Sequence, residues 1–424
     1  MAKKWLALLF LIWTPSAFAF DLDAAPETTI RLTPTITFGG QIAFQHEEKL
    51  NFDLAGGTPD GVSRDASEIS LSFDYRPAPR FQAFLNTTFA GDLRREEGAA
   101  DENGVQTEIE EAFVLVKSGV DGRFFLQVGR QPFDDDRQWL YDANLDGIRA
   151  LYRQRLWTLE LSAGRANGEG DDPKSSQPEN GSDHYLARGT YEHDEETEFS
   201  AYLISRQSRK GRPGRQATRP VFFGLHADGE VYNGVDSWLE LAYVGGRDGT
   251  KKIRGIGFDV GATYEFSRPL SPALSLGYAF GTGDNNPADG VDRNFRQTGL
   301  QENDGAFSGV PGFKYYGEVF DPALSNLAIF SAGVGLRPAE SWSIDWVYHL
   351  YRQHRAVRVL HDTGIESNPN GRSLNLGREI DMIVGGETAR IEWKLVIGYF
   401  MPGPAFPSDA ADALLVNVEG QFHF

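Results

Sequence analysis

Six basic residues have types and spacings that could serve one chemistry, the binding of anions. Arg149 and Arg153 alternate with Ile148, Ala150 and Tyr152, so in an extended strand they lie on the face opposite those residues. A guanidinium stays protonated in a narrow pore and donates paired hydrogen bonds to a carboxylate. A ring of such groups would select anions. The candidates are Arg130, Arg149, Arg153, Arg188, Arg390 and Lys394.

The alternative for these residues is pairing with acids on the same inward face. The inward acids predicted from the same alternation are Asp74, Glu160, Glu240, Asp259, Asp345, Asp381, Glu392 and Glu419. An ion pair balances the charge of an arginine and so weakens its electrostatic attraction for an anion in the pore. The sequence leaves open which of the basic residues stay unpaired.

Other chemistry is poorly supported by the motifs in the chain. No G-x-S-x-G, H-E-x-x-H or P-loop motif occurs, and no Ser/His pair stands out on neighbouring strands. The run Asp134-Asp135-Asp136 and the acids within 284–292 have oxygen ligands suited to calcium. Solvated acidic loop tips are the simpler interpretation of both. We therefore expect no enzyme, no metal and no cofactor.

One further basic run consists of Arg206, Arg209, Lys210, Arg212, Arg215 and Arg219. We predict it to lie in an extracellular loop, where it would gather an anionic polymer or pair with lipopolysaccharide phosphates. A solvated loop is the alternative. Since the formal net charge is −19 and no other basic run occurs, we expect no nucleic-acid partner.

The elements that must position these residues are amphipathic strands. Apolar and polar residues alternate within 69–75, 258–266, 390–399 and 416–424. Such runs are near ten residues long, the length of a tilted strand that crosses a bilayer. A soluble sandwich also alternates, but its apolar face would not end so often in aromatic residues. The chain has no cysteine and no run of about 18 apolar residues, so we expect no spanning helix.

The alternation predicts about eighteen strands. Their predicted starts lie near residues 31, 67, 80, 107, 122, 145, 156, 183, 197, 219, 236, 256, 272, 326, 341, 376, 390 and 412. Short connections alternate with long ones such as 46–66, 245–255 and 282–325. We therefore predict an all-β fold, a transmembrane antiparallel β-barrel with short periplasmic turns and long extracellular loops in the outer membrane.

The first nineteen residues are predicted to be a signal peptide that precedes the barrel domain, residues 20–424. Lys3 and Lys4 precede an apolar run, and Ala17-Phe18-Ala19 has the pattern of a cleavage site. A buried N-terminal helix is the alternative. The last residue, Phe424, resembles the terminal aromatic signal recognised by barrel-assembly machinery.

Two segments resemble the alginate export family of outer-membrane proteins. The first contains Gly129-Arg130-Gln131, Asp136-Arg137-x-Trp139-x-Tyr141-Asp142 and Leu145-Asp146-Gly147-x-Arg149. The second contains Tyr315-Tyr316-Gly317 and Leu324-Ser325-Asn326-Leu327. The resemblance implies a monomeric barrel that passes alginate through an arginine-rich constriction lined by Arg130 and Arg149. The other four basic candidates come from strand alternation.

The chain departs from that family at the periplasmic mouth, which the characterised exporter closes with a long turn between two late strands. Here the turn at 386–388 is short, so the long connection 282–325 is the better candidate to fold inward. The expected function is passive export of an anionic exopolysaccharide, with that polymer, outer-membrane lipid, lipopolysaccharide and periplasmic polymer-export components as partners. The alternatives are an anion-selective porin for small acidic nutrients and a plugged surface barrel.

Overall fold

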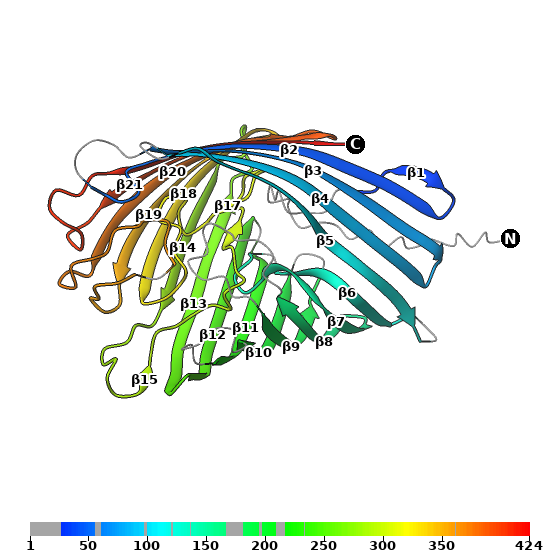
Figure 1. The fold of residues 1–424 in the computed structure, drawn as a ribbon, viewed down its shortest axis with the longest axis horizontal. Coiled ribbons are helices and arrows are strands. Elements are labelled where there is room, and N and C mark those ends of the chain that lie inside the picture. The colour runs from blue at the N-terminus through cyan, green and yellow to red at the C-terminus, as the bar shows by residue number, and fades with distance from the viewer. Residues whose placement is uncertain are drawn as a thin grey trace.

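The chain folds into a closed barrel of antiparallel strands, shown as a computed structural model in Figure 1. The structure describes residues 27–55, 61–96, 100–119, 122–135, 137–166, 181–194, 197–208, 217–232, 234–360 and 362–424. The predicted signal peptide, residues 1–19, lies outside these ranges. Within them, no helix has the length and apolar character needed to span a membrane.

Eighteen strands form the barrel wall, which confirms the predicted number. They are β2 (Ile36–Leu50), β3 (Gly61–Ala78), β4 (Phe81–Glu96), β5 (Glu102–Ser118), β6 (Phe124–Asp134), β7 (Asp142–Gln154), β8 (Trp157–Ala166), β9 (Ser182–Glu192), β10 (Glu198–Ser208), β11 (Thr218–Tyr232), β12 (Val235–Asp248), β13 (Lys251–Glu265), β14 (Ala273–Gly281), β18 (Leu327–Ala339), β19 (Trp342–Gln353), β20 (Asn375–Glu387), β21 (Ile391–Pro402) and β22 (Ala413–His423). The pairing of β2 with β22 closes the ring.

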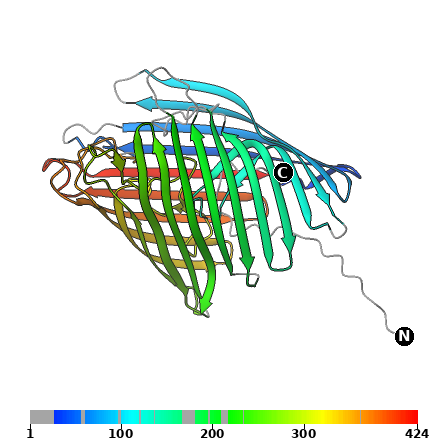
Figure 2. The same cartoon turned by 90° about the horizontal axis from the view of Figure 1, so that it is seen from below.

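Four short strands lie outside this ring of eighteen. β1 (Ile30–Thr33) pairs with the start of β2, beyond the last residue of β22. β15 (Val291–Asp292), β16 (Asp304–Gly305) and β17 (Phe313–Lys314) belong to the long connection between β14 and β18. β1 and the C-terminus lie at the same end of the barrel in both Figure 1 and Figure 2.

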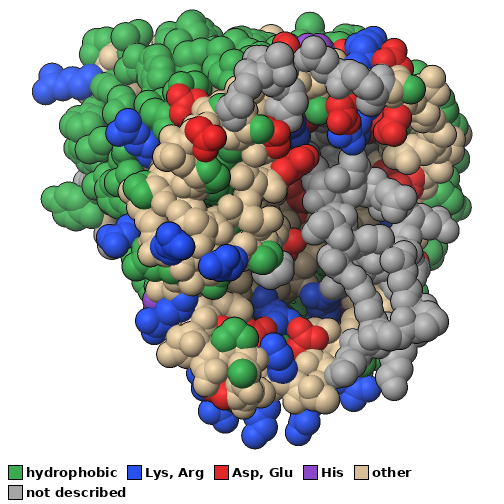
Figure 3. Space-filling view, turned by 60° about the vertical axis from the view of Figure 1, so that its left-hand side comes forward, with side chains coloured by type: hydrophobic (Ala, Val, Ile, Leu, Met, Phe, Trp, Pro, Cys, Tyr) green, Lys and Arg blue, Asp and Glu red, His purple; other side chains and the backbone are tan. Residues whose placement is uncertain are grey.

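The alternation of residue types separates an apolar outer surface from a polar interior. On β3, Ile69 and Phe73 are exposed, whereas Ser70, Ser72 and Asp74 are buried. Successive side chains of a strand point to opposite faces of the sheet, so this pattern repeats around the wall. Figure 3 shows a hollow lined by acidic and basic side chains at the barrel end that faces the viewer.

Several strands extend further than the sequence predicted at the end of the barrel away from the C-terminus. The predicted long loop 245–255 is wrong: β12 continues to Asp248, β13 begins at Lys251, and Gly249 turns the chain with a φ of 58°. Likewise, Arg206 lies in β10 and is buried, and Arg219 lies in β11. Glycines and charged residues near strand ends hid the alternation there. Residues 209–216 lie outside the described part.

The connection from 282 to 326, called the inner loop below, folds into the barrel. Phe313, Tyr315, Val319 and Phe320 of this loop are buried, and the Phe320 ring stacks on Phe400 of β21 with centroids 5.3 Å apart. The Val310 N–H donates to Ser343 Oγ at 2.7 Å, close to the start of β19. The loop therefore crosses most of the barrel height and covers the inner wall near β18–β21.

Candidate functional site

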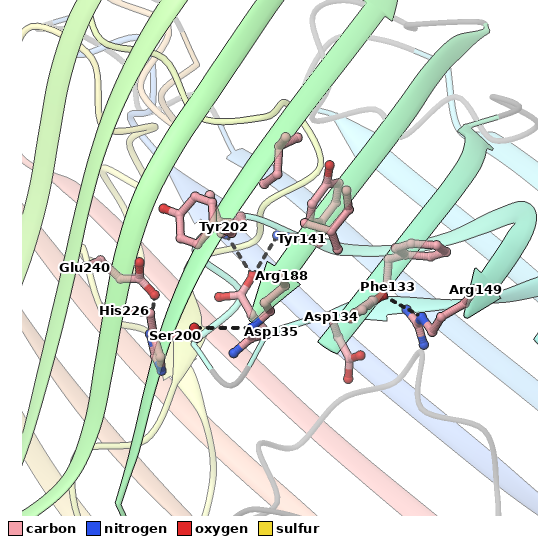
Figure 4. A pocket seen from close by; sticks show the side chains of 14 residues that line it. Phe133, Asp134, Asp135, Tyr141, Arg149, Arg188, Ser200, Tyr202, His226 and Glu240 are labelled. Atoms are coloured by element: carbon pink, nitrogen blue, oxygen red, sulfur yellow. Dashed lines mark hydrogen bonds and ion pairs between the residues drawn. The ribbon is translucent and has the colours of Figure 1, made fainter. Parts of the chain in front are cut away.

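A pocket opens on the inner wall that β6–β12 form, and no residue of the inner loop is part of its lining. Its lining residues come from each of the strands β6–β12 and from the connection after β6. Figure 4 shows aromatic and charged side chains converging on it. Its lining includes Phe133, Tyr141, Arg149, Arg188, Tyr202 and Glu240. The three aromatic residues and Glu240 are buried, whereas the side chains of Arg149 and Arg188 stay partly exposed. The lining therefore offers a solute mainly charged hydrogen-bonding groups.

Arg149 of β7 points inward, as the alternation predicted, and is held by three groups. It forms an ion pair with Glu160 at 3.0 Å and donates to the Pro132 carbonyl at 2.7 Å. Its guanidinium carbon lies 4.3 Å from the centre of the Phe133 ring. These contacts fix the direction of the guanidinium without burying it completely, since 16% of the side chain stays exposed.

Arg188 of β9 is the second predicted arginine in the pocket. Its Nη2 lies 2.8 Å from Glu198, and its Nε donates to Ser200 Oγ at 3.2 Å. Glu198 also lies 3.4 Å from His226 Nε2, whose other ring nitrogen meets Glu240. A chain of alternating basic and acidic groups thus runs across β9–β12, and it balances much of the arginine charge.

The other predicted residues do not join this pocket. Arg130 donates to Glu108 at 2.7 Å and to the Glu110 carbonyl at 3.0 Å. Arg153 is exposed near the end of β7, with its guanidinium 5.4 Å from the Phe125 ring. Arg390 is exposed in the turn before β21. Both exposed arginines lie at the barrel end that carries the C-terminus.

Lys394 faces inward, as predicted, but the inner loop covers it. Its ammonium group lies 3.2 Å from Glu419 and 3.4 Å from the Gly312 carbonyl of that loop. The structure therefore brings together only Arg149 and Arg188 of the six candidates. Arg130, Arg149, Arg188 and Lys394 all have acidic partners, as the alternative interpretation proposed. Glu160 and Glu419 were among the acids predicted, whereas Glu108 and Glu198 were not.

The connection after β6 shapes one side of the pocket through Asp135. This carboxylate accepts the backbone N–H groups of Trp139, Leu140 and Tyr141 at 2.8 to 2.9 Å. Such bonds tie the connection into a compact turn and present Tyr141 to the pocket. Asp135 thus has a structural role, and Asp136 lies outside the described residues. No group of three metal-ligating side chains occurs in the ranges that the structure describes.

The two segments that carried the family resemblance meet inside the barrel. Trp139 Nε1 donates to Tyr316 OH at 2.9 Å, and Tyr315 OH donates to the Arg137 carbonyl at 2.8 Å. The Arg137 guanidinium lies 4.1 Å from the Tyr315 ring centre and 3.5 Å from Asp259. These residues attach the inner loop to the connection after β6 and, through Asp259, to β13.

Carboxylates of the barrel wall hold the rest of the inner loop. Glu379 of β20 accepts the N–H of Val319 at 2.6 Å, the N–H of Phe320 at 3.0 Å and the Tyr351 hydroxyl at 2.9 Å. Within the loop, burial raises the pKa of the Glu318 carboxyl to about 7. The loop is thus anchored at many points along its path.

The structure also contains a Ser/His pair that sequence analysis missed. Ser331 of β18 and His349 of β19 are directly opposite, with Oγ 2.8 Å from Nδ1, and Asp381 of β20 lies 3.3 Å from Nε2. All three are buried, so the arrangement offers a substrate no access. Strand register brings these residues together, and no sequence spacing reveals that register.

Sequence analysis also missed His226 and Tyr202 as pocket residues. Both follow the inward alternation of their strands, as Glu240 does on β12. The alternation alone could have placed them inside. Alternation could not, however, distinguish these pocket residues from the many inward residues that the inner loop covers.

Comparison with known proteins identifies the fold and the family. The chain is similar to three solved Pseudomonas aeruginosa structures. OccK7 (OpdD) has 10% identity and a TM-score of 0.58, covering 92% of this chain and 98% of its own. OccK5 (OpdH) has 9% identity and a TM-score of 0.58, with coverages of 91% and 98%. OpdK, solved with vanillate, has 11% identity and a TM-score of 0.55, with the same coverages.

No match was found among the curated proteins. The model of the alginate export family matches residues 35–414, nearly the whole barrel. The chain therefore belongs to the alginate export family and is an outer-membrane β-barrel channel.

Proposed function

We propose that this channel passively exports an anionic polysaccharide, alginate or a similar polyuronate, past the pocket that holds Arg149 and Arg188. The observation that carries the proposal is that two partly exposed arginine side chains line the same pocket on the inner wall. A polyuronate carries one carboxylate per sugar. Arginine can bind such a carboxylate in a bidentate manner.

The ion pairs suit a pathway in which each contact must be released. Glu160 and Glu198 compete with the polymer for Arg149 and Arg188, so the binding of each carboxylate stays weak. Conduction through successive sites requires such weak binding. No nucleotide-binding motif occurs in the sequence, and we assign the driving force to polymer synthesis and periplasmic export components.

The arginines outside the pocket take supporting roles in this proposal. Short connections join the strands at the C-terminal end of the barrel, as at 79–80, 155–156 and 340–341, so we place that end in the periplasm. Arg153 and Arg390 would attract the polyanion at this mouth, and Arg130 would guide it near β6. We assign no direct substrate contact to Lys394, because the inner loop covers it.

A second candidate is uptake of small acidic solutes. It is favoured by the inner loop, which fills part of the lumen, and by the fold shared with OpdK, a structure solved with vanillate. A polymer and a small acid differ in how they affect ionic current. A polymer blocks the channel for as long as it is threaded, whereas a small acid competes briefly.

Single-channel recording in planar bilayers tests both candidates. We expect an anion-selective current that polyuronate blocks. R149Q and R188Q should weaken this block several-fold. E160Q and E198Q should strengthen anion selectivity, because they release the paired arginines. R165Q is the control, since Arg165 pairs with Asp183 outside the pocket.

Three results would contradict export through this pocket. Block by small sugar acids but not by polymer would favour uptake. No current in any condition would indicate a plugged barrel. Unchanged selectivity in R149E and R130E would show that these arginines do not set the passage of anions.

A further inference from the structure

We propose that the outer face of β11–β13 binds the phosphate groups of a phosphorylated glycolipid of the outer leaflet, of the lipopolysaccharide class. The site consists of Arg219, Arg247, Lys252 and Arg254, called the outer basic row below. This proposal concerns the lipid-facing surface and is independent of the substrate that passes through the lumen.

Strand register brings the four residues together. Arg219 of β11 is directly opposite Arg247 of β12, and Arg247 is directly opposite Lys252 of β13. Arg254 lies two residues further along β13, opposite Gly245. Neighbouring strands are about 4.8 Å apart, so three positive charges form a continuous line with a fourth beside it.

The outer basic row points away from the lumen. Arg219 shares a face of β11 with the exposed Val221, and Arg247 shares one of β12 with the exposed Tyr243. Lys252 and Arg254 alternate with the buried Ile253. All four basic residues are exposed. Figure 3 shows Lys and Arg side chains gathered along the lower edge of the molecule, the side on which β12 and β13 lie in Figure 1.

These charges have no acidic partners within the described residues. The structure records no ion pair and no side-chain hydrogen bond for any of the four in that part of the chain. Like charges directly opposite each other on neighbouring strands are destabilising. The lumen arginines, in contrast, are paired. Among the described residues nothing balances the charge of the row, so a bridging anion would add stability.

The surface beside the row fits an amphiphile with phosphates and acyl chains. A Cβ placed on Gly245 would lie 3.1 Å from Cε1 and 3.4 Å from the hydroxyl of Tyr243. The tyrosine therefore extends over the glycine toward the row, where its hydroxyl can donate to a phosphate. Below it, Phe223, Leu225 and Leu241 expose apolar surface, which suits acyl chains.

The position of the outer basic row along the barrel indicates which leaflet of the membrane it meets. The row lies at the beginning of β11, the end of β12 and the beginning of β13, at the end of the barrel opposite the C-terminus. With the termini periplasmic, this end meets the outer leaflet. Arginine and lysine bind phosphate strongly, and a lipid with two phosphates can bridge several members of the row.

Thermal unfolding of the detergent-purified barrel tests the proposal, with diphosphoryl lipid A and phosphatidylglycerol as the probes. We expect lipid A to raise the Tm of the wild type by several degrees and phosphatidylglycerol to raise it much less. The variant R219Q/R247Q/K252Q/R254Q should lose the response to lipid A. R155Q/R268Q is the matched control, because both arginines are exposed in turns at the other end.

R247E provides a test that does not depend on loss of stability. Glutamate at this position would pair with both Arg219 and Lys252, so we expect a higher Tm without lipid and no response to lipid A. Equal responses in the wild type and the quadruple variant would overturn the proposal. Equal responses to the two lipids would overturn the glycolipid assignment. The glycolipid assignment would also be overturned if the lipid-free protein were a dimer and the quadruple substitution dissociated it, because the row would then bind a second copy of the chain.

Discussion

Inward-facing glutamates have different roles on the two sides of the lumen. Near β18–β21, Glu379 accepts backbone N–H groups of the inner loop, and the loop seals the wall behind buried aromatic residues. Near β6–β12, Glu160 and Glu198 pair with arginines that stay partly exposed. Inward direction alone therefore does not make a side chain part of the pathway. Whether an inward side chain can reach the solute depends on which other part of the chain covers it.

The two kinds of carboxylate also differ in how easily their contacts can be replaced. A carboxylate that accepts buried backbone donors is costly to remove, because each donor is left unsatisfied. A carboxylate paired with a partly exposed arginine contributes much less, since water and salt can replace it. We therefore expect the side near β18–β21, called the sealed side below, to stay fixed. On the side near β6–β12, we expect the arginines to exchange their carboxylate partners for those of the solute.

Removing the inner part of the inner loop should have the largest effect. Replacing residues 300–320 by a short Gly/Ser linker would uncover Lys394 and the wall near β19–β21. We expect single-channel conductance to rise several-fold, because the conducting cross-section widens. Y316F is the control, since it keeps the ring and loses only the hydroxyl contacts to Trp139 and Asp259. Unchanged conductance would mean that the loop does not restrict the pore.

Replacing Glu379 by alanine should loosen the same side without shortening the loop. The change leaves the N–H groups of Val319 and Phe320 and the Tyr351 hydroxyl without their acceptor. We expect a loss of about 3 kcal/mol in the free energy of unfolding and cleavage of the loop by added protease. E392A is the control, because Glu392 pairs with His423 near a strand end. Protease resistance equal to that of wild type would contradict the anchoring role.

The smallest expected effect is a pH dependence confined to the sealed side. Burial raises the pKa of Glu318 from 4.5 to about 7, so the folded protein keeps this proton where the unfolded chain has lost it. The Glu318 contribution to stability is complete below the unfolded value and declines as the pH rises to about 7. We expect Tm to fall over this range and E318Q to show a flatter profile. Identical profiles would exclude Glu318 as the cause.

Much of the fold could be predicted from alternation, because successive side chains of a strand point to opposite faces whatever their partners are. The number of wall strands and the inward direction of Arg149, Arg188 and Lys394 followed from this local rule. The rule failed near strand ends. The sequence 245–255 is rich in glycine and charge, which led to the prediction of a loop where β12 and β13 continue.

The candidate site was less predictable, because its composition depends on contacts between distant residues. The family resemblance singled out Trp139 and Tyr316 but could not show that they bond to each other inside the lumen. The Ser331–His349 pair and the outer basic row both depend on register between neighbouring strands. Register is set by the pairing of whole strands, which no short motif encodes.

Local periodicity thus decides that this chain is a barrel with basic residues in its lumen. Only the tertiary structure decides which of them the lumen exposes. The path of the inner loop depends on anchors such as Asp259 and Glu379, which lie far from Tyr316 and Val319 in sequence. Those contacts cover Lys394 and leave Arg149 and Arg188 beside open space, because burial is a property of the packed barrel and not of any single strand.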